Sequence, residues 1–286
     1  MGGVTAALPD AAAPQPREAA LLSRLESLGS VLVAYSGGVD SAYLAWAAHR
    51  VLGPRALAVT AESESYPERH RAMALTIASQ FGLAHEILHT RELDNPEYRA
   101  NAPDRCYHCK HELFSRLNAL AGSRGFSAVA DGNNADDRGD YRPGRRAARE
   151  FGVISPLDEA GLTKRDVRAL SREAGLPCWD EPASACLSSR VPYFSEVTAA
   201  KLRTIELAEA AIRNLGFRVV RVRHHGELAR IELGREEMAR ALDEDLSQAI
   251  DRALTALGFR VVSIDPKGYR MGSLNEGITL EPVGKA

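Results

Sequence analysis

The string SGGVDS at residues 36–41 constrains the fold of this chain more than any other feature. It follows an apolar run at 31–35 and precedes a segment at 40–53 with the apolar spacing of a helix. Two glycines let the backbone bend tightly and approach a ligand, and the free amides at a helix start bind anions. The string is neither a Walker A motif nor GxGxxG. An ordinary turn also uses glycines, but the whole string in this position favours a phosphate site.

Strand and helix patterns alternate through the first two thirds of the chain. The predicted strands are 31–38, 56–63, 85–90, 126–134 and 152–157, and the predicted helices are 20–28, 40–53, 67–82, 106–125 and 163–177. Thr163 can cap the last helix and Gly175 can end it. This alternation predicts an α/β fold in which a parallel sheet carries helices on both faces. Ligands bind at the carboxyl ends of such strands, where we expect Gly37, Gly38, Glu62, Ser63, Asp131 and Gly132.

The pattern changes near residue 190. A long helix at 197–217, a hairpin-like segment at 218–234, a helix at 235–259 and a strand at 260–275 predict a smaller α+β domain. We therefore expect a leader at 1–18, a nucleotide-binding domain at 19–185, a second domain for substrate binding or oligomerisation at 186–275, and a tail at 276–286.

Composition excludes several classes of protein. The chain has 286 residues, and 36 Lys plus Arg stand against 38 Asp plus Glu, giving a net charge of −2. A nucleic-acid binder is usually basic, so this balance argues against that function. No apolar run reaches membrane-spanning length, and the first residues lack the features of a signal peptide, so we expect a cytoplasmic protein without a membrane partner. The four cysteines are too few for a disulfide scaffold, and a reducing compartment favours metal or catalytic roles for them.

The cysteines leave several possibilities open. Cys106 and Cys109 form a CxxC at a predicted helix start, where the helix dipole favours a thiolate, and Cys178 and Cys186 follow much later. They can be unrelated buried thiols, or the CxxC can be a redox dithiol. All four can hold a structural zinc ion. Alternatively Cys106, Cys109 and Cys186 can hold an iron–sulfur cluster with one iron left open for a transferable sulfur.

The SGGxDS string resembles the pyrophosphate loop of the N-type ATP pyrophosphatases, the PP-loop superfamily. The resemblance implies that ATP adenylylates an oxygen of the substrate, the loop holds pyrophosphate with Mg²⁺, and a nucleophile then displaces AMP. The residues that it implies for ATP and pyrophosphate are Ser36, Gly37, Gly38, Asp40, Ser41, Ala61, Ser63 and Gly132, with Asp40 also near Mg²⁺.

A closer resemblance, to the LarE family, covers nearly all of the chain after the leader. It is carried by AYSGGVDSAYL (34–44), PDRCYHCKHELFSRL (103–117), DYRPG (140–144), LSSRVPY (187–193), LGFRVVRVRHHGELARIEL (215–233) and GYRMGSLN (268–275). This family thiolates a pyridinium dicarboxylate mononucleotide during synthesis of the nickel-pincer nucleotide. One type of member sacrifices a cysteine, and another carries a [4Fe–4S] cluster on three cysteines. The position that matches the sacrificed cysteine is Ala185, with Cys186 one residue later, so a slip of one residue restores the sacrificial route.

The same resemblance assigns roles to further residues. It implies catalysis by Cys106, Cys109, Cys186 and Arg190, substrate contacts by Ser189, Arg190, Arg221 and Arg223, and a metal or anion site at Lys110, Glu209 and Glu232. Solvated strand faces and surface salt bridges are the simpler interpretations of the charged residues among them. The resemblance also implies a homo-oligomer and a sulfur donor, either a protein or free sulfide. The alternatives are a tRNA thiolase of the same superfamily and a non-catalytic nucleotide- or zinc-binding module.

Overall fold

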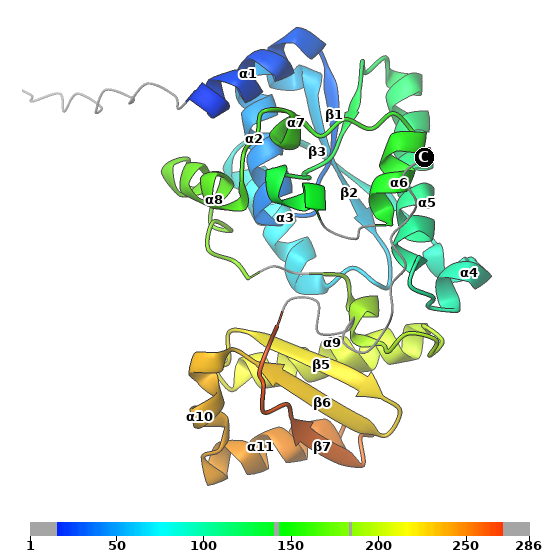
Figure 1. The fold of residues 1–286 in the computed structure, drawn as a ribbon, viewed down its shortest axis with the longest axis vertical. Coiled ribbons are helices and arrows are strands. Elements are labelled where there is room, and N and C mark those ends of the chain that lie inside the picture. The colour runs from blue at the N-terminus through cyan, green and yellow to red at the C-terminus, as the bar shows by residue number, and fades with distance from the viewer. Residues whose placement is uncertain (1–15, 140–142, 183–184, 271–286) are drawn as a thin grey trace, which may run out of the picture.

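The computed structural model describes residues 16–139, 143–182 and 185–270, and two sheets organise it (Figure 1). The larger sheet has the strand order β3-β2-β1-β4, with every neighbouring pair parallel. Its strands are β1 (Val31–Ala34), β2 (Ala56–Glu62), β3 (Ala84–His89) and β4 (Val129–Ala130). The predicted α/β fold is confirmed. Within the described ranges, no helix combines the length and apolar character that a membrane crossing requires.

Helices cover both faces of the larger sheet (Figure 1). One face packs against α1 (Pro16–Leu28), α2 (Val39–Leu52), α3 (Glu68–Gln80) and α8 (Lys164–Glu173). The other packs against α5 (Arg105–Arg124) and α6 (Gly144–Glu150). Alternate strand residues point to opposite faces, so Val31 and Val33 join the first core whereas Leu32 joins the second.

The smaller sheet has the order β5-β6-β7. β5 (Val220–His225) and β6 (Leu228–Leu233) are antiparallel, and β7 (Val261–Ile264) pairs with β6 in parallel. α9 (Ala199–Asn214) and α11 (Glu244–Thr255) pack against it through Ile212 and Leu254. This is the predicted smaller α+β unit.

Short elements connect the long ones. They are η1 (Gly53–Arg55), η2 (Glu92–Asp94), α4 (Pro96–Arg99), η3 (Ala135–Gly139), α7 (Pro156–Glu159), η4 (Leu187–Arg190), η5 (Arg235–Glu237) and α10 (Met238–Ala241). Local sequence sets the ends of α8 as predicted. Thr163 and Asp166 form a capping box at its start, and Gly175 follows its end with a φ of 74°.

Several predicted elements are shorter than expected. The strand predicted at 152–157 is an isolated parallel bridge between Ile154 and Ala130, because Pro156 cannot donate to a sheet and begins α7 instead. The strand predicted at 126–134 shrinks to the two residues of β4. In the last third, β7 ends at Ile264, because a turn follows in which the Asp265 carboxylate accepts the Lys267 amide at 2.8 Å.

The helix predicted at 235–259 is wrong as one element. It divides into η5, α10 and α11, because Asp243 begins a new helix by accepting the Leu246 amide at 3.2 Å. The leader prediction also extends too far. Pro16 to Glu18 form the first turn of α1, and the buried Glu18 carboxylate accepts a hydrogen bond from Tyr43 at 3.0 Å. Residues 1–15 and the predicted tail at 276–286 lie outside the described residues.

Candidate active site

The predicted pyrophosphate loop joins β1 to α2, and two glycines give it its shape. Gly37 has a φ of 67°, and a Cβ atom there would lie 2.9 Å from the Ala74 backbone nitrogen. A Cβ atom on Gly132, at the carboxyl end of the neighbouring β4, would lie 2.9 Å from the Ser41 nitrogen. Neither position has room for a side chain, so the segment after β4 packs closely against the start of α2, where free backbone amides are suited to binding an anion.

Hydroxyl groups close the loop on itself. The Ser36 amide donates to Ser41 Oγ at 3.1 Å, and Ser41 Oγ donates to the Gly38 carbonyl at 3.1 Å. Ala61 and Ser63 lie at the carboxyl end of β2, on the same edge of the sheet as the loop. The strand order therefore brings together the residues predicted to bind ATP.

Asp40 has two partners at the start of α2. Its carboxylate accepts hydrogen bonds from Lys164 Nζ and, at 3.2 Å, from the Asn134 amide. Lys164 is the first residue of α8, and its backbone amide donates to Asp136 at 2.9 Å. Lys164 is not predicted as a site residue by the sequence pattern, and its one signal is the cap at Thr163, which fixes where α8 starts.

The three cysteines singled out for sulfur chemistry lie on two adjoining segments. Cys106 is exposed on the first turn of α5, Cys109 follows one turn later, and Cys186 directly precedes η4. Tyr98 Oη and Ser188 Oγ are 2.6 Å apart, which ties α4 to η4 beside these cysteines. Cys106 and Cys186 both lie within electrostatic reach of Cys109.

The Cys109 thiol is not the activated thiolate that the helix dipole predicts. Burial raises its pKa well above the ordinary value, and the negative charges of Glu92 and Cys186 raise it further. Glu92 itself is buried and accepts hydrogen bonds from Ser63 at 2.6 Å and Ser65 at 2.7 Å. Burial and a nearby carboxylate thus outweigh the dipole at this position.

Cys178 lies apart from the other three thiols. It is completely buried in the apolar core between the larger sheet and α2, where burial raises its pKa to about 11. Its charged neighbours are Glu181, Asp40 and Lys164 rather than another cysteine. In the described part of the chain, no three His, Cys, Asp or Glu side chains are gathered closely enough to hold a metal ion. As they stand, the described side chains therefore close neither a four-cysteine zinc site nor a site on Cys106, Cys109 and Cys186.

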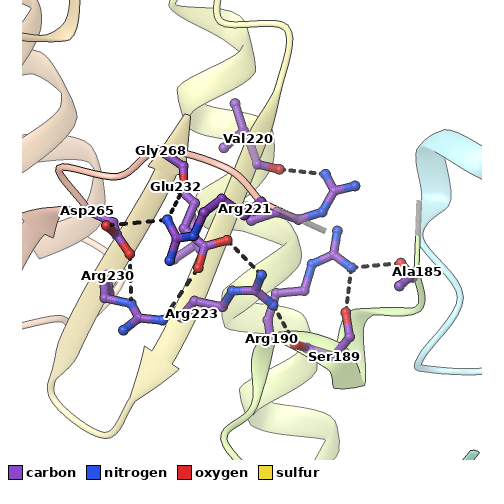
Figure 2. A network of polar contacts seen from close by, with 12 residues as sticks. Ala185, Ser189, Arg190, Val220, Arg221, Arg223, Arg230, Glu232, Asp265 and Gly268 are labelled. Carbon is purple, nitrogen blue, oxygen red and sulfur yellow. Dashed lines mark hydrogen bonds and ion pairs between the residues drawn. The ribbon is translucent and has the colours of Figure 1, made fainter. Parts of the chain in front are cut away.

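A cluster of buried arginines faces the Cys186 segment (Figure 2). Arg190, with 1% of its side chain exposed, donates from Nη1 to the carbonyls of Ala185 at 2.7 Å and Cys186 at 2.9 Å. Arg223, on β5, donates to the Ser189 carbonyl at 2.7 Å. Arg221 donates to the Val220 carbonyl at 2.7 Å. The cluster thus joins η4 to the smaller sheet.

Two buried carboxylates balance part of this charge. Glu209 on α9 accepts from Arg190 Nε at 2.8 Å and from Arg213 at 2.7 Å. Glu232 on β6 accepts from Arg223 at 2.6 Å. Burial alone would raise the pKa of Glu209, but Arg190 lowers it to about 2. The structure does not place Lys110 with these carboxylates; its neighbours are Gly144, the Phe114 ring and the charges of Cys109 and Asp131.

Arg221 is a buried arginine that has both cationic neighbours, Arg190 and Arg213, and the Glu209 carboxylate around it. Burial and then Arg190 lower the pKa of Arg221 to about 10. Burial and then the charges of Arg69, Arg190 and Arg221 lower the pKa of His70, on α3, to about 4. Arg221 with this pKa keeps its charge near neutral pH, whereas His70 is neutral there, and a buried group of cations of this kind favours the binding of an anion.

Known proteins resemble this chain over most of its length. A family model described as asparagine synthase matches residues 18–118. The pyridinium-3,5-bisthiocarboxylic acid mononucleotide synthase of Lactiplantibacillus plantarum is 38% identical over 264 residues, covering 92% of this chain and 95% of the relative. An uncharacterized protein of Synechocystis sp. is 44% identical over 252 residues, covering 88% of this chain and 94% of the relative. The tRNA(Ile)-lysidine synthase of a Bradyrhizobium strain is 29% identical over 225 residues, covering 71% of this chain and 59% of the relative.

Proposed function

The chain belongs to the LarE family of PP-loop enzymes and is an ATP-using, sulfur-transferring enzyme, and from this premise we propose that its substrate is pyridinium-3,5-biscarboxylate mononucleotide. In the first step a substrate carboxylate oxygen attacks the α-phosphorus of ATP, and pyrophosphate leaves. In the second step a sulfur nucleophile attacks the activated carbonyl carbon, and AMP leaves with the original carboxylate oxygen. The product is a thiocarboxylate.

The pyrophosphate loop supports the first step. In the proposed complex the backbone amides at the start of α2 stabilise the negative charge of the leaving pyrophosphate, and the close packing of Gly37 and Gly132 supports this role by fixing the loop in place. Asp40 is the residue of this loop that suits Mg²⁺, since carboxylates are its preferred ligands. Lys164, which pairs with Asp40 in this structure, then binds a phosphate oxygen in its place.

The burial of Arg190, Arg221 and Arg223 beside the Cys186 segment is the observation that carries the substrate assignment. The proposed substrate bears a phosphate and two carboxylates, and arginine binds both kinds of group through paired hydrogen bonds. Arg190 and Ser189 lie beside Cys186, so an anion held by the cluster also lies next to the sulfur-bearing segment. An anionic substrate would restore the pKa of Arg221 toward its ordinary value.

We further propose that Cys106, Cys109 and Cys186 hold a [4Fe–4S] cluster. The donor chemistry supports this proposal, because thiolates are the usual ligands of such clusters, and Cys106 and Cys186 lie within electrostatic reach of Cys109. The side chain of Cys106, which is exposed, must turn toward Cys109 before the three thiolates can bind one cluster. When bound, a cluster with one iron not held by cysteine offers a place for the sulfur that is transferred.

The substrate assignment is tested by pyrophosphate release. The full chain with ATP should release pyrophosphate only when pyridinium-3,5-biscarboxylate mononucleotide is present, and bulk tRNA should not replace it. Arg221→Met should lose most of this release at low substrate concentration, whereas Arg252→Met, which removes an exposed arginine on α11, should not. Release that depends on tRNA would identify the chain as a tRNA-modifying enzyme instead.

The cluster assignment is tested by metal analysis. Protein purified without oxygen should contain about four irons and a matching amount of acid-labile sulfide per chain. Cys106→Ala should lose both, and Cys178→Ala should retain both, because Cys178 lies in the apolar core. Zinc, or no metal in the wild type, would contradict the proposal, and loss of sulfur from Cys186 after one turnover would indicate the sacrificial route.

A further inference from the structure

Arg105 is a buried cation without an acidic partner. Its side chain is on the first turn of α5, directly before Cys106, and the residue is 3% exposed. Its hydrogen bonds go from Nη1 to two neutral acceptors, the Asn101 side-chain oxygen and, at 2.9 Å, the Ser188 carbonyl. Among the described residues no carboxylate lies within ion-pair distance of it. Burying a guanidinium in this way is costly unless an anion joins it.

Three carboxylates on the neighbouring segments of the chain, those of Asp104, Glu97 and Glu92, have other partners. Asp104 and Glu97 contact His108, at 3.5 Å and 3.1 Å. Glu92 accepts the hydroxyl groups of Ser63 and Ser65. None of these carboxylates forms an ion pair with Arg105. The positive charge of Arg105 can therefore attract an anion bound beside the cysteines.

The same arginine connects the two cysteine segments. Asn101, which accepts from Arg105, donates its own amide to the carbonyls of Val191 at 3.2 Å, Pro192 at 2.7 Å and Ser195 at 3.0 Å. Arg105 reaches the Ser188 carbonyl, two residues after Cys186. The charge of Arg105 therefore sits at the junction between the segment of Cys106 and that of Cys186, and both thiols act on it electrostatically.

We propose that Arg105 is a positioning residue for the sulfur site, whose buried charge holds an anionic sulfur species between Cys106 and Cys186. The inference deepens the proposed function, since it assumes that these cysteines carry the transferred sulfur. The ligand class is anionic sulfur: hydrosulfide, or sulfur bound to a cysteine or to a cluster. Arg105 contributes charge and places the two segments, and it does not itself react.

The test compares two thiol reagents that differ in charge. Iodoacetate is an anion and iodoacetamide is neutral, and both attack the same thiolate. The ratio of their rates at Cys106 and Cys186, measured by mass spectrometry on the reduced, metal-free full chain, therefore reports local charge independently of how much thiolate is present. Arg105→Gln keeps a side-chain donor and removes the charge. We expect the iodoacetate-to-iodoacetamide ratio to fall by about tenfold in this variant and by much less in Arg105→Lys.

Two controls separate charge from structure. Arg99→Met removes a half-exposed arginine on the neighbouring α4 and should leave the ratio unchanged. If Arg105→Gln does not fold, the wild type alone suffices, because folded protein should show a ratio about tenfold above that of the same thiols in urea. A ratio unchanged by folding, or by Arg105→Gln in folded protein, would overturn the proposal. The assay uses neither ATP nor substrate, so its outcome stands apart from that of the proposed function.

Discussion

In the proposed function the pyrophosphate loop and the arginine cluster both bind an anion, but they are built in opposite ways. The loop uses backbone amides from one continuous string, and its geometry depends on the absence of side chains at Gly37 and Gly132. The cluster uses side chains from η4, α9 and β5, and its geometry depends on buried ion pairs. We therefore expect the loop to lose activity when a side-chain atom is added to it, and the cluster to lose stability when one of its charges is removed.

The largest expected effect comes from adding one methyl group to the loop. Gly37→Ala should lower substrate-dependent pyrophosphate release by about a hundredfold or more. The added methyl group forces the loop away from Ala74, and its backbone amides then no longer point at the pyrophosphate. Gly29→Ala is the matched control: Gly29 has a φ of 73° but open space around it, so this variant carries the backbone strain alone. Equal loss of activity in both variants would show that strain, rather than close approach, limits the loop.

The cluster should instead respond to a lost charge. Arg190→Met leaves the Glu209 carboxylate buried beside fewer cations, and we expect a loss of about 3 to 5 kcal/mol in the free energy of unfolding. The double variant Arg190→Met, Glu209→Met should be more stable than the sum of the two single variants predicts. Urea unfolding measures all of these values. Simple additivity would mean that the pair does not act as one unit.

These two regions also differ in how far the sequence predicts them. The glycine string, the alternation of strands and helices and the edge where the strands end were all predictable, because they depend on local patterns. The pairing of Arg190 with Glu209, and of Arg223 with Glu232, was not, because it depends on how α9 and the smaller sheet pack. Lys164 and Arg105 were missed for the same reason, since each acts on a segment distant in sequence. The prediction of a thiolate at Cys109 failed because a CxxC spacing does not reveal that the thiol is buried, and burial raises its pKa.

The buried ion pairs of the arginine cluster also predict how the stability of the protein depends on pH. The pKa of Glu209 is lowered from its ordinary value of 4.5 to about 2, so the folded state binds its proton more weakly than the unfolded state does. The stabilisation is therefore present above about pH 4.5 and is lost as the pH falls toward about 2. Between pH 5 and pH 3 the free energy of unfolding, measured with urea, should therefore fall less in Glu209→Gln than in the wild type. Glu206→Gln, on the same helix, should retain the wild-type slope, and a flattened slope there would argue against Glu209 as the source.

The smallest effect on pyrophosphate release is expected from Lys164, whose side chain contacts the loop at Asp40. Lys164→Met should lower pyrophosphate release by about tenfold, because it removes one charge-assisted hydrogen bond and leaves the backbone amides in place. Lys164→Arg should retain most of the activity. A loss in Lys164→Met as large as that in Gly37→Ala would contradict the view that backbone amides dominate at the loop.

The central claim is that ATP-activated substrate and cysteine-held sulfur meet at the arginine cluster. The most direct test is a single turnover of the anaerobically purified chain with ATP and limiting pyridinium-3,5-biscarboxylate mononucleotide, followed by mass spectrometry of the product and quantification of AMP. The account predicts a thiocarboxylate product, with one AMP released for each sulfur atom incorporated. Release of AMP with unchanged carboxylate, or no AMP release with this substrate, would contradict it.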